Sequence, residues 1–165
     1  MPAGTTSAQR VIPRVVTVLL LIIAGLAVIP SLAVPAQAST RYVGARILDQ
    51  AETRLNDPYS YGSAGPYYFD CSGLVDWSAV SVGERNWPRD TYGIAAQIGY
   101  RFVLTSHPVR GDLALWGTVR APYHVEIVTA WSGWTFGAET STWAGRVTWH
   151  SSAWFPPSFY LHILW

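Results

Sequence analysis

Hydrophobic positions recur at helical spacing early in the chain and gather in short strand-like segments later. Over residues 41–55, RYVGARILDQAETRL, apolar side chains recur three or four positions apart, which predicts one helix. The apolar positions are Val43, Ile47, Leu48, Ala51 and Leu55. Asn-Asp-Pro at 56–58 would end this helix, and residues 58–70 are rich in Gly, Pro, Ser and Tyr, as loops are.

A second helix is predicted from Cys71 to about Ala79. Asp70 or Ser72 can cap its first turn, and Gly83 would close it. A thiol in the first turn of a helix faces unsatisfied backbone N–H groups and the positive end of the helix dipole. Both features favour the thiolate, which is the nucleophilic form of cysteine.

A short third helix is predicted around residues 93–98, and after residue 111 the pattern changes to strands. Five segments are short, β-branched or aromatic, and separated by turn residues. They are residues 112–116, 124–131, 134–141, 145–151 and 159–165. Helices followed by an antiparallel meander predict the α+β class, with N-terminal helices packed on an antiparallel β-sheet.

The N-terminal 38 residues have the pattern of a secretory signal peptide. Arg10 and Arg14 precede the uncharged apolar run 15–29, Pro30 follows it, and residues 36–38 read Ala-Gln-Ala. This pattern predicts cleavage after residue 38 and export to the cell envelope or beyond. The alternative is an uncleaved anchor, since the run is near the short end of a membrane-spanning helix. Residues 39–165 are then one domain's length.

Charge and cysteine content narrow the function. Residues 39–165 hold nine Arg, no Lys and ten acidic residues, a balance that lacks the basic surface of a nucleic-acid-binding protein. Cys71 is the single cysteine, whereas exported domains usually contain none or an even number. It therefore pairs with another molecule, lies deeply buried, or is retained for its reactivity. One cysteine also excludes a Cys-rich zinc site.

Residues 58–75, 87–97, 110–116 and 123–129 form four motifs that together resemble the NlpC/P60 family of cell-wall cysteine peptidases. Residues 58–75, PYSYGSAGPYYFDCSGLV, resemble the motif around the family's nucleophile. WPRDTYGIAAQ at 87–97, RGDLALW at 110–116 and YHVEIVT at 123–129 resemble later motifs in the same order. The broader relatives known as CHAP domains share the Cys, Gly-Asp and His-Val elements. The resemblance implies a papain-like fold, with Cys71 as nucleophile, His124 as base, and no metal or cofactor.

The resemblance leaves the third catalytic residue open. The family commonly places a His on the next strand, about a dozen residues after the base, where this chain has Phe136 and Gly137. Glu139 would share a strand face with Gly137, and CHAP-like enzymes use Glu or an amide there, so Glu139 is expected to orient His124.

Two alternatives remain for this third role, Glu126 and His150. The family has a small residue at the position of Glu126, and strand alternation puts Glu126 on the same face as His124. Glu126 could orient His124, bind a cationic part of the substrate, or reach solvent. His107 and His162 are expected to be a loop residue and a structural residue.

The motifs also imply substrate-binding residues. Tyr59 matches a family tyrosine near the nucleophile, and Arg89 matches the family's Pro-Arg pair. Asp70 and Ser72 match positions that help to hold the free amino group of a stem peptide in peptide-cleaving members. Helix capping is the alternative role for Asp70 or Ser72, packing in the loop for Tyr59, and a surface charge for Arg89.

The expected function is that of a secreted, monomeric peptidoglycan hydrolase that cleaves an amide bond in stem peptides, such as D-Glu–diaminopimelate. One alternative is a non-catalytic cell-wall-binding or interaction module on the same fold. Another is a secreted antibacterial effector amidase. Five tryptophans in the C-terminal third could form a surface for sugar rings or a protein partner. They are Trp131, Trp134, Trp143, Trp149 and Trp154.

Overall fold

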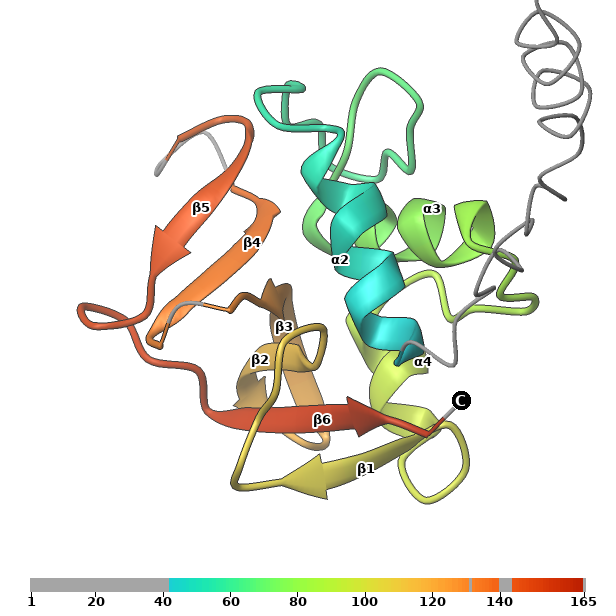
Figure 1. The fold of residues 1–165 in the computed structure, drawn as a ribbon, viewed down its shortest axis with the longest axis vertical. Coiled ribbons are helices and arrows are strands. Elements are labelled where there is room, and N and C mark those ends of the chain that lie inside the picture. The colour runs from blue at the N-terminus through green and yellow to red at the C-terminus, as the bar shows by residue number, and fades with distance from the viewer. Residues whose placement is uncertain (1–41, 131, 140–143, 165) are drawn as a thin grey trace, which may run out of the picture. The chain divides into compact units, whose positions relative to one another are not determined.

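The computed structural model describes residues 42–130, 132–139 and 144–164. The predicted signal peptide and Trp131 and Trp143 lie outside these residues. Within them, helices α2 (Val43–Glu52), α3 (Cys71–Ser81) and α4 (Thr91–Ala96) precede the strands. Figure 1 shows α2 and α3 side by side, next to the sheet. No helix in the described part of the chain is long and apolar enough to cross a membrane.

Aspartate side chains cap the starts of two of the three helices. The apolar positions of α2 are buried as predicted, although the helix ends three residues before the expected boundary. Asp70 caps α3, and its side chain accepts a hydrogen bond of 2.6 Å from the Gly73 N–H. Asp90 caps α4 through the Gly93 N–H at 2.7 Å, so α4 begins two residues earlier than predicted.

Six antiparallel strands form one sheet in the order β1-β6-β2-β3-β4-β5. The strands are β1 (Phe102–Thr105), β2 (Leu113–Thr118), β3 (Ala121–Val128), β4 (Trp134–Ala138), β5 (Val147–Ser151) and β6 (Phe159–Ile163). β2 to β5 form the predicted meander, but β6 returns to pair with β2, so the prediction of a simple meander is wrong. β1 was not predicted because FVLT is short and exposes its two middle residues instead of alternating.

The core lies between α2 and α3 and the sheet. α3 packs against β3 and β4, and α2 packs against α3 and β4. Leu74 of α3, Ile127 of β3 and Phe136 of β4 are fully buried, and each such side chain contributes about 1.5–3 kcal/mol through burial. This packing fixes the start of α3 opposite β3. The α+β prediction is confirmed.

Candidate active site

Cys71 is the first residue of α3 and is held by the network around Asp70. The Asp70 carboxylate accepts hydrogen bonds from the Gly62 N–H at 2.8 Å and the Gly73 N–H at 2.6 Å. A side chain at Gly73 would overlap the carbonyl oxygen of Ser63, so this glycine lets the preceding loop lie against the first turn of α3. The thiol is half-buried and not part of a disulfide.

His124 of β3 and Cys71 line the same cavity, which has a volume of about 540 Å³. The side chain of His124 is 15% exposed. The ring of Trp116, which pairs with His124 across β2 and β3, packs against the imidazole with ring centroids 5.1 Å apart. The structure therefore brings together the nucleophile and base expected from the sequence, at the surface of one cavity.

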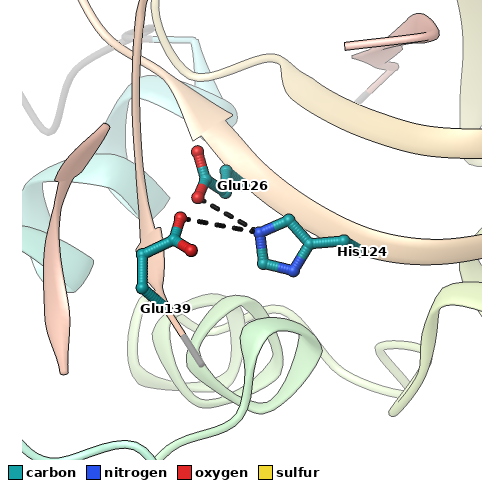
Figure 2. A group of neighbouring side chains, drawn as sticks. All are labelled: His124, Glu126 and Glu139. Carbon is teal, nitrogen blue, oxygen red and sulfur yellow. Dashed lines mark hydrogen bonds and ion pairs between the residues drawn. The ribbon is translucent and has the colours of Figure 1, made fainter. Parts of the chain in front are cut away.

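Two carboxylates lie beside His124 on the Nε2 side of its ring (Figure 2). Nε2 is 3.1 Å from Oε1 of Glu126 and 3.7 Å from Oε1 of Glu139. The hydroxyl of Thr135 donates to the other oxygen of Glu126. Glu126 is thus the carboxylate within hydrogen-bond distance of the imidazole, while Glu139, the residue expected from sequence, lies slightly farther away.

The buried side chain of Glu126 occupies space on the sheet face that a side chain at Gly137 would otherwise fill. The register that pairs Ile127 with Phe136 places Gly137 next to Glu126 on the neighbouring strand. A Cβ added at Gly137 would lie 2.5 Å from Cγ of Glu126. The family pattern has a small residue on the strand of the base and a polar residue on the next strand. This chain has the reverse, with Glu126 on β3 and Gly137 on β4.

The electrostatics favour a charged imidazole next to a charged Glu126. Burial acts against the charged form of His124, but interactions with Cys71, Glu126 and Glu139 outweigh it and raise the pKa of His124. Burial likewise acts against charge on Glu126, but hydrogen bonds with His124 and His150 hold the pKa of this carboxyl below its ordinary range. Burial and the neighbouring Glu126 raise the pKa of Glu139, although His124 opposes this. Glu139 is the carboxyl that more readily keeps its proton.

His150 of β5 completes the group around the two carboxylates. Its Nδ1 is 3.6 Å from Oε2 of Glu126 and 3.9 Å from Oε1 of Glu139. Interaction with Glu126 is the main cause that raises the pKa of His150, while burial opposes it. Within the described residues, the donor atoms of His124, Glu126 and Glu139 lie within 4.8 Å of one another, so they could hold a metal ion.

The expected substrate-binding residues also lie at the cavity. Arg89 forms an ion pair with Asp70 at 2.8 Å and contacts the Ser72 hydroxyl at 3.2 Å. Asp70 caps α3, which is the alternative role considered for it, and also binds Arg89; its role in holding the amino group of a substrate stays a prediction. Burial, together with the charges at Cys71 and Asp70, raises the pKa of Tyr59, which keeps its phenol protonated and able to donate.

The other histidines lie away from this group. Nδ1 of His162 is hydrogen-bonded to the Asp112 carboxylate at 2.8 Å, and the imidazole stacks on the ring of Tyr42. His162 therefore has the structural role expected for it. His107 is exposed in a turn. Of the tryptophans expected to form a surface, Trp154 is 90% exposed, whereas Trp149 packs edge-on against Phe136.

The sequence analysis missed Trp116, Thr135 and Gly137. Trp116 belongs to the quoted RGDLALW motif, but its contact with His124 depends on the pairing of β2 with β3. Thr135 and Gly137 alternate with Phe136 along β4, and this alternation could have placed both on one face. Their contact with Glu126 needed the β3–β4 register.

Comparisons with known proteins agree with this fold. The sequence model of the NlpC/P60 family matches residues 56–144, more than half of the chain. A probable endopeptidase of Corynebacterium glutamicum strain R is 43% identical over 72 residues, which cover 43% of this chain and 34% of that protein. This chain therefore spans about a third of that relative's length.

Solved structures give the same result. The crystal structure of the NlpC/p60 domain of the peptidoglycan hydrolase SagA is 28% identical, with a TM-score of 0.64 over 73% of this chain and 98% of that one. RipD of Mycobacterium tuberculosis, described as a non-catalytic NlpC/p60 domain protein, has the same fold at 16% identity, with a TM-score of 0.59 over 76% of this chain and 99% of that one. The resemblance found in the sequence is confirmed: the chain belongs to the NlpC/P60 family.

Proposed function

We propose that this protein is a cysteine hydrolase that cleaves an amide bond in the stem peptides of peptidoglycan. The observation that best supports this is the position of Cys71 and His124 on one cavity, with the thiol at the start of α3. The helix start supplies backbone N–H groups and a positive dipole, and His124 supplies a base.

In the proposed reaction, the sulfur of Cys71 attacks the carbonyl carbon of the scissile amide. Nε2 of His124 faces Glu126, so Nδ1 is the ring nitrogen that accepts the thiol proton. The backbone N–H of Cys71 would donate to the oxyanion. His124 then gives its proton to the leaving amine as the C–N bond breaks, and a water molecule hydrolyses the thioester and restores the thiol.

The two carboxylates have different proposed roles. Glu126 is charged, lies 3.1 Å from Nε2, and would orient the ring and stabilise the imidazolium. Glu139, expected from the sequence to orient His124, lies 3.7 Å from the same nitrogen and has a raised pKa. We assign it a supporting role next to Glu126. His150 would stabilise the charge of Glu126 from the other side.

The proposed substrate follows from the cavity and the relatives. SagA is named a peptidoglycan hydrolase and the Corynebacterium relative a probable endopeptidase. Ser72 and Arg89 line the cavity next to the thiol and would bind polar groups of a stem peptide, while Asp70 holds Arg89 in place. Tyr59 would donate a hydrogen bond near the acyl centre. Export through the predicted signal peptide, residues 1–38, would deliver the protein to this substrate.

Digestion of purified peptidoglycan, followed by mass spectrometry of the products, tests the proposal. The parental protein should release fragments with a new amine and a new carboxylate at one amide position. Cys71→Ser, which keeps the size of the side chain, should release none. Binding to peptidoglycan without cleavage by the parental protein would instead indicate a non-catalytic binding module.

A further inference from the structure

Three buried or half-buried side chains lie together on the Nε2 side of the His124 imidazole. Together with the imidazole they form the His/Glu cluster, which consists of His124, Glu126, Glu139 and His150. The residues come from β3, from the position directly after β4 and from β5. We propose that the His/Glu cluster binds a divalent transition-metal ion, and that Zn²⁺ is the best match.

Three donor atoms, from His124, Glu126 and Glu139, lie close enough together to share one ion, and His150 borders them. Zn²⁺ binds imidazole nitrogen and carboxylate oxygen at about 2.0–2.2 Å, so neighbouring donors in a tetrahedral site lie roughly 3.3–3.5 Å apart. Nε2 of His124 lies 3.1 Å from Glu126 and 3.7 Å from Glu139. Nδ1 of His150 lies 3.6 Å from the other oxygen of Glu126, Oε2, and 3.9 Å from Oε1 of Glu139, so His150 supports the carboxylates from the far side. The donor atoms of His124, Glu126 and Glu139 all lie within 4.8 Å of one another, so these three side chains would supply the direct ligands.

A second observation at Glu139 independently points to a ligand. This residue is only 5% exposed, and its Oε1 is fully shielded from solvent. Among the described residues, this oxygen has no hydrogen-bond partner, although it lies near both imidazoles. A buried carboxylate oxygen without a donor is costly, and coordination to a cation would satisfy it.

The surroundings of the cluster resemble those of metal sites. The hydroxyl of Thr135 donates to Glu126, which would orient this carboxylate as outer hydrogen bonds orient metal ligands. The ring of Trp116 packs against both imidazoles, at centroid distances of 5.1 Å to His124 and 6.2 Å to His150. The two imidazoles are each about 15% exposed, which gives an ion a route into the site.

The cluster differs from a simple thiol–metal site because Cys71 is not among its donors. A metal on Nε2 of His124 would leave the ring proton on Nδ1, so the ring could no longer accept the thiol proton. If the proposed hydrolysis occurs, Zn²⁺ should therefore inhibit it reversibly. This consequence rests on the proposed function, whereas the binding itself does not.

Calorimetric titration of chelator-treated protein with ZnCl₂ tests the proposal without any substrate. The parental protein and Cys71→Ser should each bind one ion. Glu139→Gln and His150→Gln should weaken binding by about tenfold or more. His107→Gln, which changes an exposed imidazole outside the cluster, should leave the affinity unchanged. His150 is partly exposed, so its variant keeps the test decisive if Glu139→Gln does not fold.

Two results would overturn the proposal. One is the absence of saturable binding to the parental protein, or equal affinities in the parental, Glu139→Gln and His150→Gln proteins. The other is loss of binding in Cys71→Ser, which would place the ion on the thiol. The spectrum of the Co²⁺ form gives a separate check. It should be that of a four-coordinate nitrogen and oxygen site, without thiolate-to-metal charge transfer.

Discussion

Gly137 leaves the space that the buried side chain of Glu126 occupies, so Gly137→Ala should disturb the imidazole through Glu126. The added Cβ would lie 2.5 Å from Cγ of Glu126, whereas carbon atoms in contact normally lie about 3.5–4.0 Å apart. Glu126 must therefore move by roughly 1 Å. Such a shift would lengthen the 3.1 Å contact with Nε2 of His124 beyond hydrogen-bond range.

The expected effects on stability and turnover differ in size. Overpacking of this kind costs about 1–3 kcal/mol of unfolding free energy, which corresponds to a fall in Tm of roughly 4 °C per kcal/mol. Misplacement of a catalytic group by about 1 Å can reduce turnover about 100-fold. We expect a loss of this order in kcat on a stem-peptide substrate, with a smaller change in KM, because the imidazole is displaced while Arg89 and Ser72 stay in place.

A double-mutant cycle provides the control. Gly137→Ala introduced together with Glu126→Ala should cost far less stability than Gly137→Ala alone, because the side chain that it displaces is gone. Equal costs in the two backgrounds would show that the effect does not pass through Glu126. Parental turnover in Gly137→Ala would refute the idea that the position of Glu126 controls His124.

Three further predictions follow from the charges. The pKa of Glu126 lies below its ordinary value of 4.5, so the charged carboxylate stabilises the fold above that pH and this stabilisation is lost as the pH falls. Glu126→Gln should therefore reduce the fall in Tm between neutral and acid pH. An unchanged dependence of Tm on pH would contradict this. Arg89→Gln should raise KM several-fold, because Arg89 is proposed to bind the substrate. It should cost at most about 1 kcal/mol of unfolding free energy, because the ion pair of Arg89 with Asp70 is partly exposed. An unchanged KM in steady-state kinetics would exclude a role of Arg89 in substrate binding. Asp112→Ala should lower the unfolding free energy by about 1–3 kcal/mol in denaturant titration, because the buried Asp112 carboxylate accepts hydrogen bonds from Tyr42 and Val109 and contacts His162. The folded fraction should keep parental kcat, and a selective loss of kcat would contradict a purely structural role.

The sequence predicts those parts of the site that depend on local signals. Apolar spacing predicts the helices, and the Asp70 cap predicts the start of α3 at Cys71. Strand alternation correctly places Glu126 on the same face as His124. These features depend on residues within a few positions of one another, so a single sequence contains the necessary information.

The remaining features depend on strand pairing, which the sequence does not specify. Whether Glu126 meets His124, a substrate or solvent is decided by the space at Gly137 and by the hydroxyl of Thr135, both on the neighbouring strand. His150 reaches the same place because β5 pairs with β4, where its partner is Thr135. The return of β6 to β2 likewise has no local signal.

The rate of Cys71 alkylation by iodoacetamide at pH 6.5, in the parental protein and in His124→Ala, tests the central claim most directly. A free thiol with a pKa near 8.5 is only about 1% thiolate at this pH, so an activated cysteine should react about tenfold faster or more. The account predicts fast alkylation that slows to the free-thiol rate when His124 is lost. Slow alkylation in both proteins would contradict an activated Cys71–His124 pair.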